Sequence, residues 1–146
     1  MNGSAFIQVA IKLAPSRDEA ERRTAVSRAY YAAFHAGRDF FDDLGFRVPR
    51  AEAAHVYVSR RLSAATSVPS LTAVGNDLNT LRGYRNQADY DMHLAMSLEK
   101  VAAGVEMAKN ILAELAKKRS PAEQSALIAE IEAYETKVLR ESTRRS

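Results

Sequence analysis

Arg85 is the residue whose position most strongly suggests chemistry. Its neighbours at three- and four-residue spacing form an apolar helix face: Leu71, Val74, Leu78, Leu81 and Ala88. Arg85 falls in this series, and a buried guanidinium is costly unless it pairs, reaches solvent or lines a cleft. Asp89 lies four residues further on, where side chains of one helix meet, so the spacing predicts an Arg85–Asp89 ion pair.

Other polar side chains gather around this position. They are Arg82, Asn86, Tyr90 and His93. Arg85, Asn86, Asp89 and Tyr90 fall within about a turn and a half of helix and supply donors, an acceptor and a hydroxyl. Such a set can bind an RNA phosphate and orient its 2′-hydroxyl without a metal ion. One alternative is that these residues are simply a hydrated helix end. Another is that the protein is a structural dimer in which the Arg85–Asp89 pair only sets register.

A second polar set lies upstream, beside the apolar face of an earlier helix. One edge of that helix carries Ser27, Tyr31, His35 and Arg38, and Arg28 lies a helical turn before Tyr31. We expect Arg28, Tyr31 and His35 to bind substrate or RNA together with Arg82. A single His on such an edge can equally be a structural residue bonded to a neighbour.

Helical periodicity extends over nearly the whole chain, and no strand is indicated. Capping signals delimit the expected helices. Ser4 is expected to cap the first, Ser16 with Glu19 to open the second as a capping box, and Gly45 to end it. Apolar spacing predicts further helices over residues 51–65, 71–90 and 94–115. A sixth begins at the Ser120–Pro121–Glu123 box, and residues 141–146 are expected to fray.

These elements predict an all-α protein, an antiparallel up-and-down bundle with a four-helix core. A short N-terminal helix precedes the core, and a helical extension follows it. We expect two parts, a bundle over residues 1–119 and an extension over residues 120–146.

The amino-acid composition excludes several kinds of functional site. The chain of 146 residues has no Cys, which excludes disulfides, Cys–zinc sites and thiol nucleophiles. Its three His are widely spaced, so neither a metal centre nor a cofactor is expected. The net charge of +3 permits an anionic partner. No apolar run is long enough for a membrane span and no secretion signal is visible, so we expect a cytoplasmic protein.

Two strings resemble the HEPN domain superfamily, in particular its small prokaryotic members. They are AVSRAYYAAFHA at residues 25–36 and LRGYRNQADY at residues 81–90, and the resemblance extends over about residues 5–118. It implies an all-α bundle that forms homodimers. Many members are toxins or defence effectors, and many are paired with a minimal nucleotidyltransferase. In the ribonucleases of the superfamily, an Arg-Asn pair and a nearby His cleave RNA without metal, and Arg85-Asn86 matches that pair.

The His of that motif follows the Arg by about four to six residues, a turn to a turn and a half of helix. Here seven residues separate Arg85 from His93, and Asp89 and Tyr90 stand where the His is expected. Two functions therefore stay open. One is a metal-independent endoribonuclease in which His93 or His35 moves protons. The other is a non-catalytic module that binds RNA, a nucleotide or a partner nucleotidyltransferase.

Overall fold

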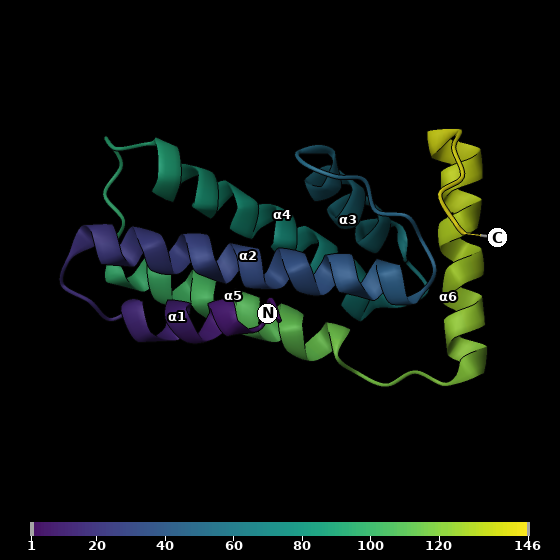
Figure 1. Ribbon diagram of the computed structural model, residues 1–146, viewed down its shortest axis with the longest axis horizontal. Coiled ribbons are helices and arrows are strands. Elements are labelled where there is room, and N and C mark those ends of the chain that lie inside the picture. Colours follow the sequence, from purple (N-terminus) through teal and green to yellow (C-terminus); the bar gives the residue numbers. More distant parts are fainter. Residues whose placement is uncertain (1, 146) are drawn as a thin grey trace. The chain divides into compact units, whose positions relative to one another are not determined.

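The computed structural model describes residues 2–145, and within that range it contains helices and no strand. The prediction of an all-α fold is confirmed. The helices are α1 (Ala5–Leu13), α2 (Glu19–Asp43), α3 (Ala53–Ala64), α4 (Pro69–Tyr90), α5 (Leu98–Leu115) and α6 (Pro121–Tyr134), followed by the π-helical turn η1 (Glu135–Leu139). Figure 1 shows their order along the chain. No helix in residues 2–145 is long and apolar enough to cross a membrane.

The chain divides into two compact units. The first takes its described residues from Met1–Ala36 and Asp77–Ala113, and the second from Gly37–Asn76 and Glu114–Ser146. Each unit is thus built from two separate stretches of sequence, and α2 and α4 contribute residues to both. The expected division into residues 1–119 and 120–146 stays a prediction.

In the first unit, neighbouring helices run antiparallel (Figure 1). Side-chain contacts give the register of α2 against α4: Ser27 contacts Asp89, and Tyr31, one turn later, contacts Arg85, one turn earlier. Small and apolar side chains fill the space between these helices and α5: Ala25, Val26, Ala88, Met96 and Val101. Two polar-edge positions of α2, one helical turn apart, are therefore held beside the last turns of α4.

The start of α2 fixes the turn between α4 and α5. The Arg23 guanidinium donates to the carbonyls of Gln87, Ala88 and Asp91, each at 3.0 Å. Gln87 and Ala88 lie in the last turn of α4, where helix carbonyls lack intrahelical donors, and Asp91 is the first residue after the helix. Because an Arg side chain caps these carbonyls, the turn after Tyr90 has a defined path back to α5.

Two capping predictions at the N-terminal end are wrong. Ser4 makes no side-chain bond to the first turn of α1. At the start of α2 the Ser16–Glu19 box does not form, because Asp18 lies closer to the helix and accepts from the N–H of Ala20 at 2.9 Å. Glu19 instead accepts from the Met96 N–H at 3.1 Å, which joins α2 to the segment before α5.

The predicted start of α5 at Leu94 is also wrong, since the helix begins at Leu98. The Ser97 side chain accepts from the Lys100 N–H at 3.1 Å, which is the bond of an N-cap residue. Apolar spacing continues upstream through Leu94, but that side chain is exposed. The cap, rather than the apolar pattern, sets the boundary.

Gly45 ends α2 as predicted, in the second unit. Its φ of +92° is open to glycine at low cost. The Phe46 N–H donates to the Phe41 carbonyl and the Gly45 N–H to the Asp42 carbonyl, both at 2.9 Å, which is the Schellman pattern. The rings of Phe41 and Phe46 pack edge to face at 6.0 Å, as the apolar contact of that motif requires.

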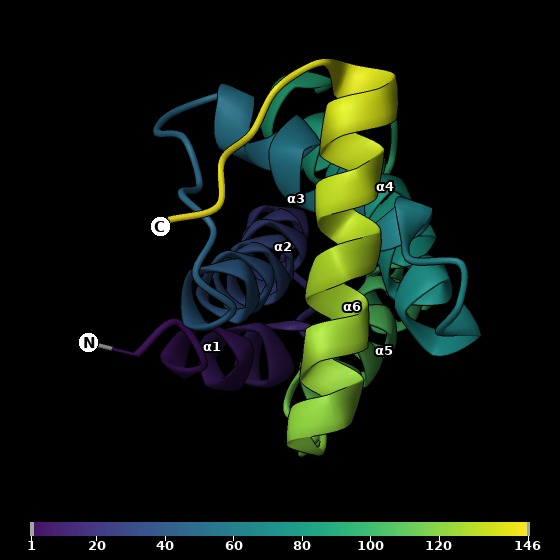
Figure 2. The ribbon, with the colours of Figure 1, turned by 90° about the vertical axis from the view of Figure 1, so that its right-hand side faces the viewer.

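The second unit places the C-terminal segment against α3 and the loop before it. The predicted Ser120–Glu123 capping box of α6 is confirmed. The expectation that residues 141–146 fray is wrong for 141–145, while Ser146 lies outside the described residues. Arg144 forms an antiparallel bridge with Phe46, and the Arg47 N–H donates to the Thr143 carbonyl at 2.9 Å. Figure 2 shows this segment running back from the end of α6 beside the 46–50 loop.

Candidate nucleic-acid site

Arg85 lies in the first unit, on the side of α4 that faces α2. The predicted ion pair with Asp89 is present, with Nε and Oδ2 at 3.0 Å. The Nε–H is not aligned for a hydrogen bond, so the attraction is mainly coulombic. Nη2 donates to the Tyr31 hydroxyl at 3.3 Å and Nη1 to the Asn86 side-chain oxygen at 3.2 Å. Asp89, Tyr31 and Asn86 therefore hold the guanidinium in place, and Arg85 as a whole is 9% exposed.

Tyr31 is the point where two cations meet. The Cζ atom of Arg28 lies 4.4 Å from the centroid of the Tyr31 ring, and that of Arg85 lies 5.5 Å from it. Arg28 also lies 5.3 Å from the ring of Phe6 on α1. Aromatic rings attract guanidinium groups through their quadrupole, which offsets part of the repulsion between two like charges. Helices α2 and α4 thus place two guanidinium groups around one ring, and Phe6 of α1 contacts one of these groups.

A chain of polar contacts joins the two arginines below that ring. Nη2 of Arg28 donates to the Ser27 hydroxyl at 3.2 Å, and this hydroxyl donates to Oδ2 of Asp89 at 3.2 Å. Asp89 is thus shared between Ser27 and Arg85. Since one carboxylate serves two guanidinium groups, the cluster has an excess of positive charge.

The charge on Arg85 is secure. Burial by itself lowers the pKa of this guanidinium, but the Tyr31 and Tyr90 hydroxyls and the Asp89 carboxylate raise it above its ordinary value. Arg85 therefore remains a cation throughout the pH range in which proteins function.

Tyr90 and Asn86 form the exposed edge of the cluster. The Tyr90 ring is 73% exposed and lies 5.5 Å from Cζ of Arg85. Asn86 is exposed and accepts from Arg85 through its oxygen, so its NH₂ group is available to a ligand. Five predicted residues are therefore brought together in direct contact: Arg28, Tyr31, Arg85, Asn86 and Asp89, with Tyr90 at their margin.

The remaining predicted residues differ in their placement. His35 stacks on the rings of Tyr31 and Phe6, with centroids at 6.2 and 6.0 Å, so it is one side chain away from Arg85. His93 is exposed in the turn after α4, and no described contact joins it to Arg85. Arg82 lies one turn before Arg85 on α4 and is half-buried. Among residues 2–145 no group of three or more His, Asp or Glu is arranged to hold a metal ion.

Two members of the cluster, Ser27 and Phe6, are not among the predicted site residues. Ser27 lies on the same edge as Tyr31, but only the observed register of α2 against α4 shows that it contacts Asp89. Phe6 has the pattern of a core residue of α1, and it supports both Arg28 and His35. The approach of α1 to α2 depends on Gly3, since a Cβ atom there would lie 2.6 Å from Cβ of His35.

Comparison with known proteins adds no assignment to this geometry: no family model, no curated protein and no solved structure matches the chain.

Proposed function

We propose that the cluster of Arg28, Tyr31, Arg85, Asn86 and Tyr90 binds single-stranded RNA. The observation that carries the proposal is the convergence of two guanidinium groups, from α2 and α4, on the Tyr31 ring. Guanidinium groups bind phosphate oxygens through paired N–H donors, and they do so best when they are already held in position. Contacts to Tyr31, Asn86 and Asp89 supply that positioning for Arg85.

Arg85 keeps donors for a ligand after its internal bonds are made. Each of its terminal nitrogens carries two hydrogens, and one on each is used by Tyr31 and Asn86. The other two can donate to one phosphate group as a pair. Arg28, which is partly exposed, would contribute to the same or the neighbouring phosphate.

Tyr90 favours a single strand over a duplex. Its ring offers an open π-face beside Arg85, and unstacked bases bind such faces with about 1–3 kcal/mol each. In a duplex the bases are stacked on one another and cannot use it. The net charge of +3 is consistent with an anionic partner.

The test is fluorescence anisotropy with a labelled single-stranded RNA over a range of salt concentrations. Replacing Arg85 by Gln is expected to weaken binding about tenfold and to reduce the salt slope by about 0.7, the contribution of one phosphate contact on a single strand. Arg17→Gln is the matched control, since Arg17 is exposed at the start of the same unit, outside the cluster. Equal losses for both variants would show diffuse attraction to charge and contradict the proposal.

A second candidate function is RNA cleavage, and the position of His35 favours it. The His35 ring stacks on Tyr31, whose hydroxyl contacts Arg85. In that reaction the 2′-oxygen attacks phosphorus as its proton passes to a base, and the 5′-oxygen leaves with a proton from an acid. His35 would exchange one of these protons, and Arg85 would hold the phosphate. Tyr90 and Asp89 would orient the sugar hydroxyl.

Cleavage is tested separately from binding, by incubating RNA with the protein in the presence of a chelator. Cleavage that is lost in His35→Gln and kept in His93→Gln would assign the reaction to His35. RNA that binds and stays intact would eliminate cleavage and leave the binding proposal in place. The homodimer and the nucleotide or nucleotidyltransferase partner implied by the family resemblance stay predictions.

A further inference from the structure

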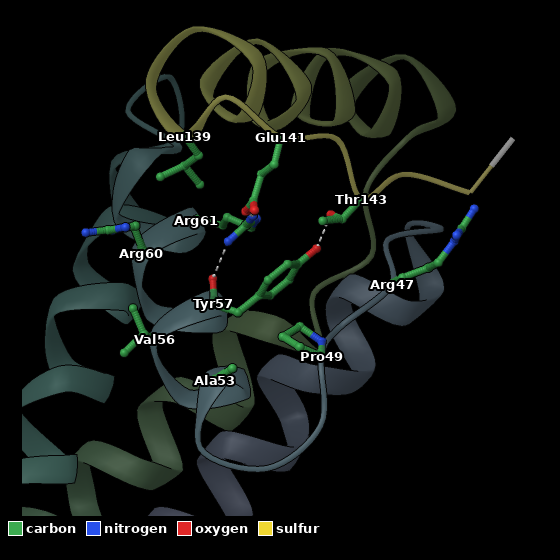
Figure 3. A pocket seen from close by; sticks show the side chains of 10 residues that line it. All are labelled: Arg47, Pro49, Ala53, Val56, Tyr57, Arg60, Arg61, Leu139, Glu141 and Thr143. Carbon is green, nitrogen blue, oxygen red and sulfur yellow. Dashed lines mark hydrogen bonds and ion pairs between the residues drawn. The ribbon is translucent and has the colours of Figure 1, made fainter.

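The second unit contains a cavity of about 430 Å³ that the proposed RNA site does not use. It lies between α3, the loop before α3, and the segment that follows η1 (Figure 3). Its lining consists of Arg47, Pro49, Ala53, Val56, Tyr57, Arg60, Arg61, Leu139, Glu141 and Thr143. This volume is within the range of sites for small organic molecules.

Arg61, which lines the cavity, forms a buried ion pair with Glu135. Nε of Arg61 lies 2.8 Å from Oε2 of Glu135, and the two side chains are 2% and 1% exposed. The Arg61 guanidinium also lies 3.5 Å from the centroid of the Tyr57 ring. Glu135 neutralises Arg61 from inside the protein, which a buried cation requires. Arg61 is thus fixed in place whatever happens on the cavity side.

A second carboxylate meets Arg61 from the cavity side. Glu141 accepts from Nη2 of Arg61, yet its side chain is 49% exposed. Figure 3 shows these two side chains meeting in the middle of the cavity, with Arg47 and Arg60 at opposite sides. Because Arg61 already has Glu135, the charge of Glu141 is not needed to neutralise it. Glu141 is therefore the partner that another anion can replace.

The walls show what else a ligand would contact. Val56 is 46% exposed although its side chain is large and apolar, and Pro49, Ala53 and Leu139 complete an apolar surface beside it. Three arginines and one glutamate are the charged residues of the lining. A cavity with apolar walls, a fixed guanidinium and excess positive charge suits an anion that carries an apolar group.

We propose that this cavity binds a small organic carboxylate with an apolar or aromatic group. The carboxylate takes the place of Glu141 on Nη2 of Arg61, and the apolar group lies against Val56 and Leu139. Glu141 acts as an internal competitor that occupies the site when the ligand is absent. The Glu141 side chain would then rotate away from Arg61, while the Glu141 N–H remains bound to the Glu135 carbonyl and Thr143 remains bound to Glu135 and Tyr57.

The test is a titration of the full chain with phenylacetate, followed by amide chemical shifts in the 53–64 and 135–143 segments. Glu141→Gln removes the competing charge and is expected to bind phenylacetate about three- to tenfold more tightly than the unmodified protein. Glu132→Gln is the matched control, because Glu132 pairs with Arg144 and does not line the cavity. Phenylacetamide, which lacks the charge, and acetate, which lacks the ring, are expected to bind more weakly than phenylacetate to the unmodified protein and to Glu141→Gln.

Val56→Glu provides a second variant that does not depend on Glu141. It places a carboxylate on the apolar wall at an exposed position, and it is expected to abolish phenylacetate binding without unfolding the protein. The proposal is wrong if Glu141→Gln and the unmodified protein bind equally, if phenylacetamide binds as well as phenylacetate, or if Val56→Glu has no effect. Absence of any binding at millimolar phenylacetate would also overturn it.

Discussion

Replacing Asp89 by Asn tests how much the ion pair contributes to holding Arg85 in place. The substitution keeps the size of the side chain and removes its charge. Arg85 would then keep its bonds to Tyr31 and Asn86 but lose its counterion, with its side chain 11% exposed. The Ser27 hydroxyl would still have an oxygen to donate to. The experiment therefore isolates the charge of Asp89 rather than its shape.

The expected cost follows from the burial of the pair. Exposed ion pairs contribute about 0–1 kcal/mol, and breaking a fully buried pair costs about 3–5 kcal/mol. Asp89 is 28% exposed and the pair lies at 3.0 Å, so an intermediate loss of about 2 kcal/mol is expected. For a chain of this length that corresponds to a fall in Tm of about 4–8 °C.

The assay is urea unfolding at neutral pH. Asp39→Asn is the control, because Asp39 is an exposed aspartate on α2, outside the cluster. Asp39→Asn is expected to change the free energy of unfolding by less than about 0.5 kcal/mol. A loss below 0.5 kcal/mol for Asp89→Asn would refute the reasoning. It would mean that Arg85 is held by Tyr31 and Asn86 alone.

Further predictions concern the backbone, the acid range and the second unit. Gly83→Ala is expected to stabilise the protein by about 0.5–1 kcal/mol, because the position is exposed, helical and free of atoms near the added methyl group. Gly45→Ala is expected to destabilise the protein by about 1–2 kcal/mol, because Gly45 has a positive φ. Urea unfolding measures both changes. The bond from the Met96 N–H lowers the pKa of Glu19, so its contribution is complete above the unfolded value of 4.5 and is lost as the pH falls through the lower native pKa. Glu19→Gln should therefore reduce the dependence of unfolding free energy on pH below that value, and an unchanged dependence would contradict the assignment. Glu135→Gln leaves the buried Arg61 guanidinium with only the half-exposed Glu141 carboxylate as its counterion, and it is expected to cost about 3 kcal/mol by thermal unfolding. A loss below about 1 kcal/mol would show that the Arg61–Glu135 pair is dispensable.

The spacing of apolar residues was sufficient to predict the helices and to identify Arg85 as a charged residue on an apolar helix face. Apolar residues at helical spacing reflect burial on one face, so the fold class followed from them directly. The same logic identified Arg85 as a cation that needs a partner, and the Asp89 spacing supplied it. Gly45 and the Ser120–Glu123 box were also correctly identified, because their backbone chemistry is local.

Boundaries and partners that depend on distant residues were not predictable in the same way. Glu19 has the spacing for a capping box with Ser16, but the Met96 N–H, 77 positions away, competes for its carboxylate. The polar composition of the C-terminal residues predicts an unstructured tail, but these residues have bonding partners in α3 and in the 46–50 loop, which are distant in the sequence. The Arg61–Glu135 pair has no signal in the sequence, since the two residues are 74 positions apart. Such pairs arise from the packing of helices, which periodicity does not specify.

The central claim, that the Arg85–Tyr31–Arg28 cluster binds RNA, is tested most directly by NMR of the arginine Nε–H groups. The protein is titrated with a short single-stranded RNA, and the arginine resonances are assigned by substitution. The Nε–H resonances of Arg85 and Arg28 are predicted to shift together with saturation, while that of Arg61 in the second unit stays unchanged. Shifts confined to other arginines, or none at saturating RNA, would contradict the claim.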